Sequence, residues 1–237
     1  MHPDPEDIIE RLRPFGSAER AVQEKRYLKS ELDFLGVPLP GIRRVVTAAA
    51  REHRDLGHDE LAGWAEALWR EPLWEARMAA VELLRAREGD LTAADLPLVY
   101  RLIREAAGWA LVDPLAGDIA GRIALRHPRA AWPVIDTWAD DADFWVRRSA
   151  LLSLLPGIRT GQPELDRLDG YATPMLGEKE FFIRKAIGWV LRELSKKDPG
   201  YVIEWTGRHL AEMSGVTFRE AVRRLPEPDA ARLRASR

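Results

Sequence analysis

The sequence contains no cysteine in its 237 residues, so neither disulfide bonds nor thiolate metal sites can form. Long apolar runs are also missing: the first residues, MHPDPEDIIERLRPFG, hold no signal-peptide core, and no stretch of twenty apolar residues follows. No segment alternates apolar and polar residues as a half-buried strand would. We therefore expect an all-α, soluble, cytoplasmic protein that does not enter a membrane.

Motifs for phosphate loops and acyl-transfer nucleophiles are absent, since no GxGxxG, GxxxxGK[ST] or GxSxG pattern occurs. The histidines lack the spacing of metal ligands. They are His2, His53, His58, His127 and His209. We expect no metal and no cofactor.

The net charge is close to neutral, at -2 with a pI near 6.3. Proteins that bind nucleic acids usually have a net positive charge, so the total charge of this chain does not indicate such a protein. A near-neutral protein can still hold a phosphate-binding surface when its Lys and Arg residues gather on one face. The distribution of charge along the chain therefore decides the question.

Amphipathic segments recur along the whole chain with a period near that of short helical repeats. The segments are 40–52, 74–84, 109–121, 144–155, 181–194 and 217–225, and their partner helices are 17–35, 58–70, 92–104, 128–138, 164–176 and 199–212. This period lies at the short end of the HEAT and armadillo range and near that of tetratricopeptide repeats, and it predicts a helical solenoid of about six helix pairs in a single domain, 1–237. An N-terminal segment, 1–16, precedes the repeats, and the tail 227–237 is a candidate for disorder.

One position of the repeat carries a charged residue in every copy, with steps of 34, 36, 35, 37 and 34 residues: Arg43, Arg77, Asp113, Arg148, Lys185 and Arg219. Equivalent positions of a solenoid line up along one surface, commonly the concave one, and five of these six side chains are cations. This charged column suits a ligand that presents a row of phosphates. The alternative is that each cation solvates a helix face or pairs with a neighbouring acid.

Asp113 is the exception in this charged column, because a carboxylate repels phosphates. A role beside a positive charge that develops on the ligand explains its placement better than surface solvation does. Trp109 precedes Asp113 by four residues and Trp189 follows Lys185 by four, which puts each indole one helical turn from its column residue. Pro114 predicts a kink or a helix start at Asp113. The alternative for the tryptophans is a place in the core.

Four blocks resemble the DNA alkylation repair family of AlkD-like DNA glycosylases. They are KRYLKSELDFLGVPLPGIRR (25–44), GWALVDPLAGDIAG (108–121), DADFWVRRSALL (141–152) and EKEFFIRKAIGWVLRELSKKDP (178–199), and the similarity continues to REAVRR (219–224). The last two blocks are the most specific. Helical propensity alone would not generate FWVRR followed by FFIRKAIGW.

The resemblance implies a concave groove of HEAT-like repeats that binds duplex DNA and excises N3- and N7-alkylated purines. Asp113 would be the catalytic carboxylate, with Trp109 and Trp189 beside the deoxyribose of the lesion. Arg148 would contact the DNA backbone and Tyr27 would face the duplex. The remaining candidates for DNA contacts are Lys185, Arg184, Arg77, Arg43 and Arg219. Pro38 departs from relatives that carry a polar residue there, which leaves the fine substrate preference open.

An alkylated purine already carries a positive charge, so its departure needs no general acid, and a carboxylate can stabilise the cationic sugar. The resemblance implies that the base stays stacked, which would admit bulky adducts. We expect a monomer that acts on DNA in the cytoplasm, at the nucleoid. Two alternatives remain: a HEAT-like protein that binds damaged or branched DNA without catalysis, and a protein-protein scaffold.

Overall fold

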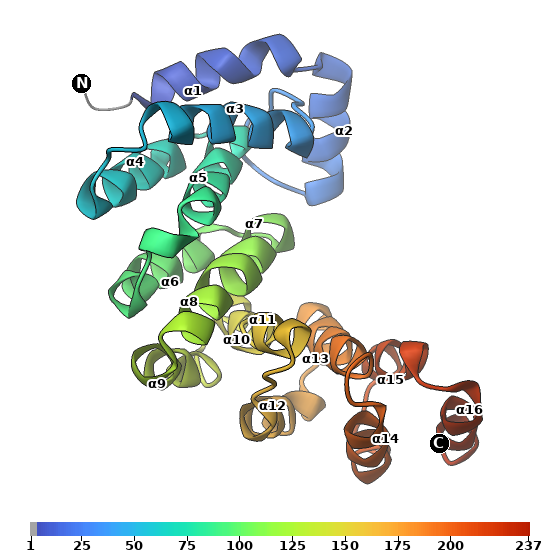
Figure 1. Cartoon of the computed structure of the whole chain (residues 1–237). Coiled ribbons are helices and arrows are strands. Elements are labelled where there is room, and N and C mark those ends of the chain that lie inside the picture. Colours follow the sequence, from blue (N-terminus) through green and yellow to red (C-terminus); the bar gives the residue numbers. More distant parts are fainter. Residues whose placement is uncertain (1–3) are drawn as a thin grey trace. The chain divides into compact units, whose positions relative to one another are not determined.

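The computed structural model describes residues 4–237, and within them the protein is all helical (Figure 1). Only an isolated bridge between Asp33 and Leu73 resembles strand pairing in this range. The all-α prediction is confirmed. Of the helices in residues 4–237, none has both the length and the apolar character that crossing a bilayer requires. His2 and the first three residues of the predicted N-terminal segment lie outside the described residues.

The chain forms two compact units, residues 1–115 and 116–237. The helices of the first unit are α1 (Pro5–Leu12), α2 (Ala18–Leu28), α3 (Leu39–Glu52), α4 (His58–Arg70), α5 (Trp74–Ala86), α6 (Leu96–Glu105) and α7 (Trp109–Pro114). Its buried side chains come from apolar positions three and four residues apart on each helix, such as Ile42, Val45, Val46 and Ala49 of α3. The prediction of a single domain stays a prediction.

The second unit continues the helical repeats. Its helices are α8 (Gly121–Arg126), α9 (Pro128–Trp138), α10 (Phe144–Leu152), α11 (Leu155–Thr160), α12 (Leu165–Ala172), α13 (Phe181–Leu194), α14 (Pro199–Arg208), α15 (Gly215–Ala221) and α16 (Glu227–Ala235). Helices α4, α9 and α13 have the bounds that the sequence predicts. The large buried side chains include Trp69 in the first unit and Trp205 in the second.

Polar contacts between helices repeat with the period of the sequence, because each repeat bonds to the next one along the chain. In the first unit, Arg43 reaches Glu82, 39 residues on, and the Trp69 indole reaches Glu105, 36 residues on. In the second unit, Lys185 reaches Glu220 across 35 residues and Trp205 reaches Asp169 across 36. The helical repeats inferred from the sequence are therefore present in both units.

The predicted segments 17–35 and 227–237 are among those that differ in the structure. The helix expected over 17–35 ends at Leu28, because Lys29 takes a left-handed conformation and Gly36 has a φ of 75°, which favours glycine. The Glu75 carboxylate holds the following loop by accepting hydrogen bonds from the backbone N–H groups of Leu35, Gly36 and Val37. Most of the tail 227–237 is helical, as α16.

Candidate functional site

The segment that carries Asp113 begins at a strained turn. Ala107 has a φ of 50°, a left-handed conformation that few residues other than glycine adopt, and α7 starts two residues later at Trp109. The turn is tied to the preceding repeat through Glu105. Its carbonyl accepts a hydrogen bond from Arg77 Nη1 at 3.0 Å, and its carboxylate accepts one from the Trp69 indole at 2.9 Å. These contacts fix where the chain enters α7.

Asp113 lies in the last turn of α7, and its side chain is half-buried. Pro114 follows as the final residue of that helix, and a π-helix over 115–120 leads into α8. Proline has no N–H to donate and its ring crowds the preceding turn, and a π-helical turn relieves both constraints. The predicted kink at Asp113 is therefore a change of helix type, with Asp113 inside the helix. Such turns are frequent at functional sites.

Two exposed aromatic side chains meet beside this segment. Tyr27 of α2 is 73% exposed and Trp109 is 36% exposed. Their ring centroids are 6.1 Å apart and the rings are perpendicular, an edge-to-face pair. Because Trp109 and Asp113 are one helical turn apart, they share a face of α7. The structure thus brings Tyr27 to Trp109, with Asp113 one turn away; we name these three residues the α7 cluster.

The predicted cations of the first unit have partners within the protein. Arg43 Nε donates to the buried Glu82 carboxylate at 3.0 Å, although the arginine itself is exposed. The Arg77 guanidinium is half-buried, it lies 5.2 Å from the centre of the Trp69 ring, and burial lowers its pKa. Arg77 is thus turned toward the turn before α7. This pairing is the alternative that the sequence left open for the charged column.

Several candidate residues of the second unit are also engaged. Arg148 is only 3% exposed, and its Nη1 donates to the Phe182 carbonyl at 2.6 Å. Arg184 Nε donates to the Glu178 carbonyl at 2.6 Å, and Lys185 pairs with the buried Glu220. Arg219 is exposed, whereas Trp189 is half-buried in the middle of α13.

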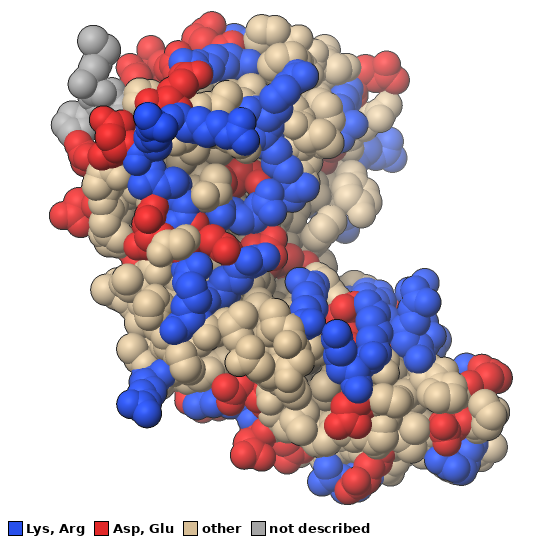
Figure 2. Space-filling model, in the orientation of Figure 1, with Lys and Arg blue, Asp and Glu red and all other residues tan. Residues whose placement is uncertain are grey.

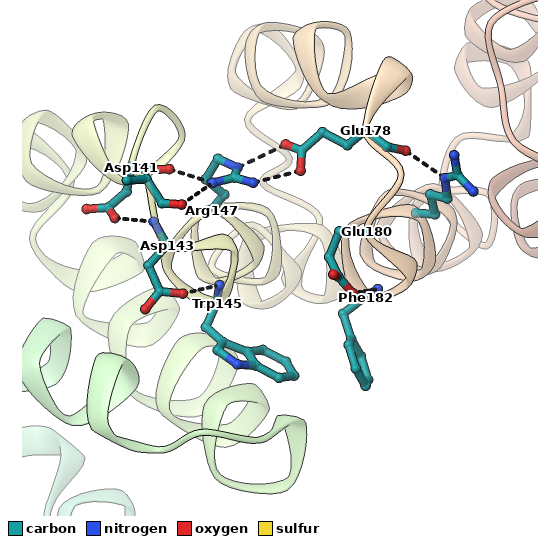
Figure 3. A network of polar contacts seen from close by, with 9 residues as sticks. Asp141, Asp143, Trp145, Arg147, Glu178, Glu180 and Phe182 are labelled. Carbon is teal, nitrogen blue, oxygen red and sulfur yellow. Dashed lines mark hydrogen bonds and ion pairs between the residues drawn. The ribbon is translucent and has the colours of Figure 1, made fainter.

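Figure 3 shows the polar contacts at the N-terminal ends of α10 and α13. Asp143 and Glu180 cap the two helices by accepting hydrogen bonds from the backbone N–H groups of Trp145 and Phe182. The rings of Trp145 and Phe182 extend to the same side, with centroids 4.8 Å apart. Arg147 bonds to both oxygens of Glu178 and to two backbone carbonyls before α10. The hydrogen bond to Glu178 raises the pKa of Arg147.

Candidate site residues fall in both units. The first unit holds Trp109 and Asp113, and the second holds Trp189 and Arg148. A joint site made from both sets stays a prediction. Within residues 4–237, no group of three or more histidine, aspartate or glutamate side chains is arranged to hold a metal ion.

A sequence model of one family, described as DNA alkylation repair enzyme, matches residues 8–225. The chain belongs to this family. A solved structure from Enterococcus faecalis, described as a predicted DNA alkylation repair enzyme, is similar at a TM-score of 0.78 and 25% identity, covering 90% of this chain and 97% of that one. The resemblance inferred from the four sequence blocks is confirmed.

Two structures from Streptococcus mutans share the fold of this DNA alkylation repair family member. The protein smu.31 aligns with a TM-score of 0.60 and 19% identity over 79% of this chain and 93% of its own. AlkD2 aligns with a TM-score of 0.58 and 17% identity over 88% of this chain and 99% of its own. No protein of curated function matches the sequence.

Two groups of side chains in this family member were missed by sequence reasoning. One is an aromatic cluster at the starts of α10 and α13, formed by Phe144, Trp145, Phe181 and Phe182. Its signal was present as the repeated pattern of an acid, two aromatic residues, a β-branched residue and arginine in DFWVR and EFFIR. The other is a group of arginines at the ends of α3 and α5, outside the charged column.

Proposed function

We propose that this protein is a DNA glycosylase that hydrolyses the N-glycosidic bond of N3- and N7-alkylated purines in duplex DNA. Membership of the DNA alkylation repair family supports DNA as the partner. The observation that carries the proposal is the α7 cluster, in which a half-buried carboxylate lies one turn from an exposed indole that meets an exposed tyrosine. A carboxylate and two aromatic rings can together stabilise a cation.

The reaction needs little from the protein besides stabilisation of charge. The bond between C1′ and the purine nitrogen breaks, and its electron pair leaves with the base, which becomes neutral. Positive charge moves to the sugar, where the Asp113 carboxylate stabilises it and orients a water molecule. The water oxygen bonds to C1′ and its proton is released to solvent. The indole face of Trp109 adds cation-π attraction to the sugar.

The size of this effect is sufficient for catalysis. Unit charges about 4 Å apart interact by about 4 kcal/mol at an effective dielectric constant of about 20. If that attraction exists only in the transition state, it corresponds to about a thousandfold in rate. Loss of the Asp113 charge should therefore affect the chemical step far more than the affinity for DNA.

The exposed position of Tyr27 and Trp109 supports an approach to the sugar from outside the duplex, with the lesion still stacked. A base that stays stacked need not fit a pocket, so bulky adducts would also be substrates. Contacts to the DNA backbone would come from the cations of the charged column and from Arg184. Arg43 and Arg219 are exposed in the structure and are the members best placed for such contacts.

A second candidate function is a scaffold that binds other proteins or, without catalysis, damaged or branched DNA. The pairing of Arg43 with Glu82 and of Lys185 with Glu220 favours it, because two cations of the charged column are already neutralised. One experiment separates these functions from the glycosylase.

The test uses duplex DNA that carries 7-methylguanine, with release of the free base measured under single-turnover conditions. We expect the natural protein to release the base and Asp113→Asn to do so at least a hundredfold more slowly while binding the duplex equally well. Asp166→Asn, an exposed aspartate of α12, is the matched control. Binding without release would indicate the non-catalytic binder, and neither would indicate the protein scaffold. An unchanged rate in Asp113→Asn would refute the catalytic role of this residue.

A further inference from the structure

Arginines line a pocket of about 660 Å³ at the C-terminal ends of α3 and α5, in the first unit. Arg51 and Arg54 come from α3 and the turn after it, and Arg85 and Arg87 come from the end of α5. One acid, the buried Glu82, also lines the pocket. Figure 2 shows Lys and Arg gathered over α3 and α5 on the face that it displays. We name this feature the arginine pocket.

Two of the four arginines are committed to the fold. Arg85 pairs with Glu82 at 2.8 Å. Arg87 donates to the carbonyl groups of His53 and Leu56 and pairs with Asp90, so it holds the loop between α3 and α4. These contacts explain why the two arginines of α5 are present. They leave the pair on the α3 side unexplained.

Arg51 and Arg54 are exposed, and neither side chain makes a hydrogen bond or ion pair with any residue of the range 4–237. A cation near a helix C-terminus offsets the partial negative charge there, which accounts for about half a unit charge at the end of α3. Glu82 is already shared between Arg43 and Arg85. Positive charge therefore remains around the pocket, and an anion would relieve the repulsion between the guanidinium groups.

We propose that the arginine pocket binds a phosphodiester of the DNA backbone, at a point separate from the α7 cluster. The inference rests on the proposed function for the identity of the partner. Planar guanidinium groups match the oxygens of a phosphate, and the Thr47 hydroxyl at the pocket edge is a further donor. A duplex is the occupant that supplies such groups in series.

The place of the pocket on α3 indicates what it adds to binding. Arg43, Thr47 and Arg51 follow one another at steps of four residues and so share a face of the helix. The rise of an α-helix puts Arg43 and Arg51 about 12 Å apart. The major groove is about 12 Å wide. Arg43 and the arginine pocket can therefore hold phosphates on the two sides of a groove, which orients the duplex.

The experiment reverses the two uncommitted charges. Arg51→Glu/Arg54→Glu is compared with Arg129→Glu/Arg208→Glu, which makes the same change of charge at exposed positions of α9 and α14. Binding of an undamaged duplex of about two helical turns is measured over a range of KCl concentrations. We expect the pocket variant to bind at least tenfold more weakly than the control at 100 mM KCl. The slope of log affinity against log salt should fall by about 1, because the one lost phosphate contact contributes about 0.9.

Further readouts separate this inference from the proposed function. At saturating protein, base release by the pocket variant should match that of the natural protein, because the α7 cluster is untouched, and its thermal unfolding should match that of the control. Equal affinity and equal salt slope in the two variants would overturn the proposal that the arginine pocket binds a phosphate. Failure of the natural protein to bind the duplex would overturn it as well. If the natural protein binds through the pocket but releases no base, the inference stands and the glycosylase proposal fails.

Discussion

The tetrapeptide Gly-Trp-Xaa-Leu occurs at 108–111 and at 188–191, and the two copies take different places in their helices. Gly108 stands before the first residue of α7, so Trp109 begins a helix and is exposed. Gly188 is in the middle of α13, a 14-residue helix, and Trp189 is half-buried. The same local sequence therefore presents one indole to solvent and packs the other.

The difference between the copies arises from their neighbours. The copy at 108 follows the left-handed Ala107 and precedes Pro114, and these two positions confine a regular α-helix to six residues. The copy at 188 is preceded by two turns of α13, which begin after the Glu180 cap. Helix α15 packs against α13. A short helix with an exposed first residue can contact a ligand, whereas a long packed helix supports the fold.

The largest expected effect comes from filling the space beside the packed glycine. A Cβ at position 188 would lie 2.6 Å from the Glu220 Cβ and 2.8 Å from the Thr217 carbonyl oxygen of α15. Gly188→Ala should therefore lower the free energy of unfolding by about 2 to 3 kcal/mol, despite the better helix propensity of alanine. Urea unfolding measures this value.

Gly108→Ala is the matched change in the other copy. There the nearest atom to the new Cβ would be the Ala106 carbonyl oxygen at 3.9 Å, an ordinary contact. We expect a loss of about 0.5 kcal/mol, from the poorer capping by alanine. Equal losses in the two variants would show that the copies are packed alike and would break the comparison.

The next effect separates stability from activity at the two indoles. Trp189→Ala should lower the free energy of unfolding by about 2 kcal/mol, because half of a large side chain leaves the packed face of α13. Trp109→Ala should change stability by less than about 1 kcal/mol but slow base release about tenfold, from the loss of cation-π attraction. Urea unfolding and single-turnover release are the two measurements. A Trp109→Ala protein that is as unstable as Trp189→Ala would contradict this view.

The smallest expected effect concerns pH. Burial raises the pKa of Glu220, but the hydrogen bond from Lys185 and the charge of Arg192 outweigh it, and the pKa is lower than usual. The stability from this carboxylate is present above its unfolded pKa of about 4.3 and is lost as the pH falls through the lower folded value. The α13–α15 contact should therefore weaken in acid, whereas the contact of Arg77 with the turn before α7 uses a carbonyl group that does not titrate.

Glu220→Gln tests this difference. The glutamine should reduce the loss of unfolding free energy between pH 5 and pH 3, measured by urea unfolding at each pH. Glu227→Gln is the control, because Glu227 is an exposed acid whose single ion pair within residues 4–237 is with Arg234. A pH dependence that is the same in both variants would assign the acid sensitivity to other carboxylates.

Much of the fold could be predicted from sequence because helices are local. The period of apolar residues and the prolines at the junctions gave the bounds of α4, α9 and α13, and the specific blocks pointed to the correct family. The tail 227–237 escaped prediction because its helix has little amphipathic pattern. Its stability comes from burial of Ala230 and Leu233, with Leu233 near Gly207 of α14.

The sequence by itself determined where the charged residues recur, and only the tertiary structure decided which of them face a ligand. Arg148 looks like Arg43 in the sequence, but it is buried and donates to the Phe182 carbonyl of the following repeat. Arg51 and Arg54 lie outside the charged column and remain exposed. The physical reason is that a helix is set by residues within a few positions, whereas the partner of each charge lies about one repeat away, where only packing can place it.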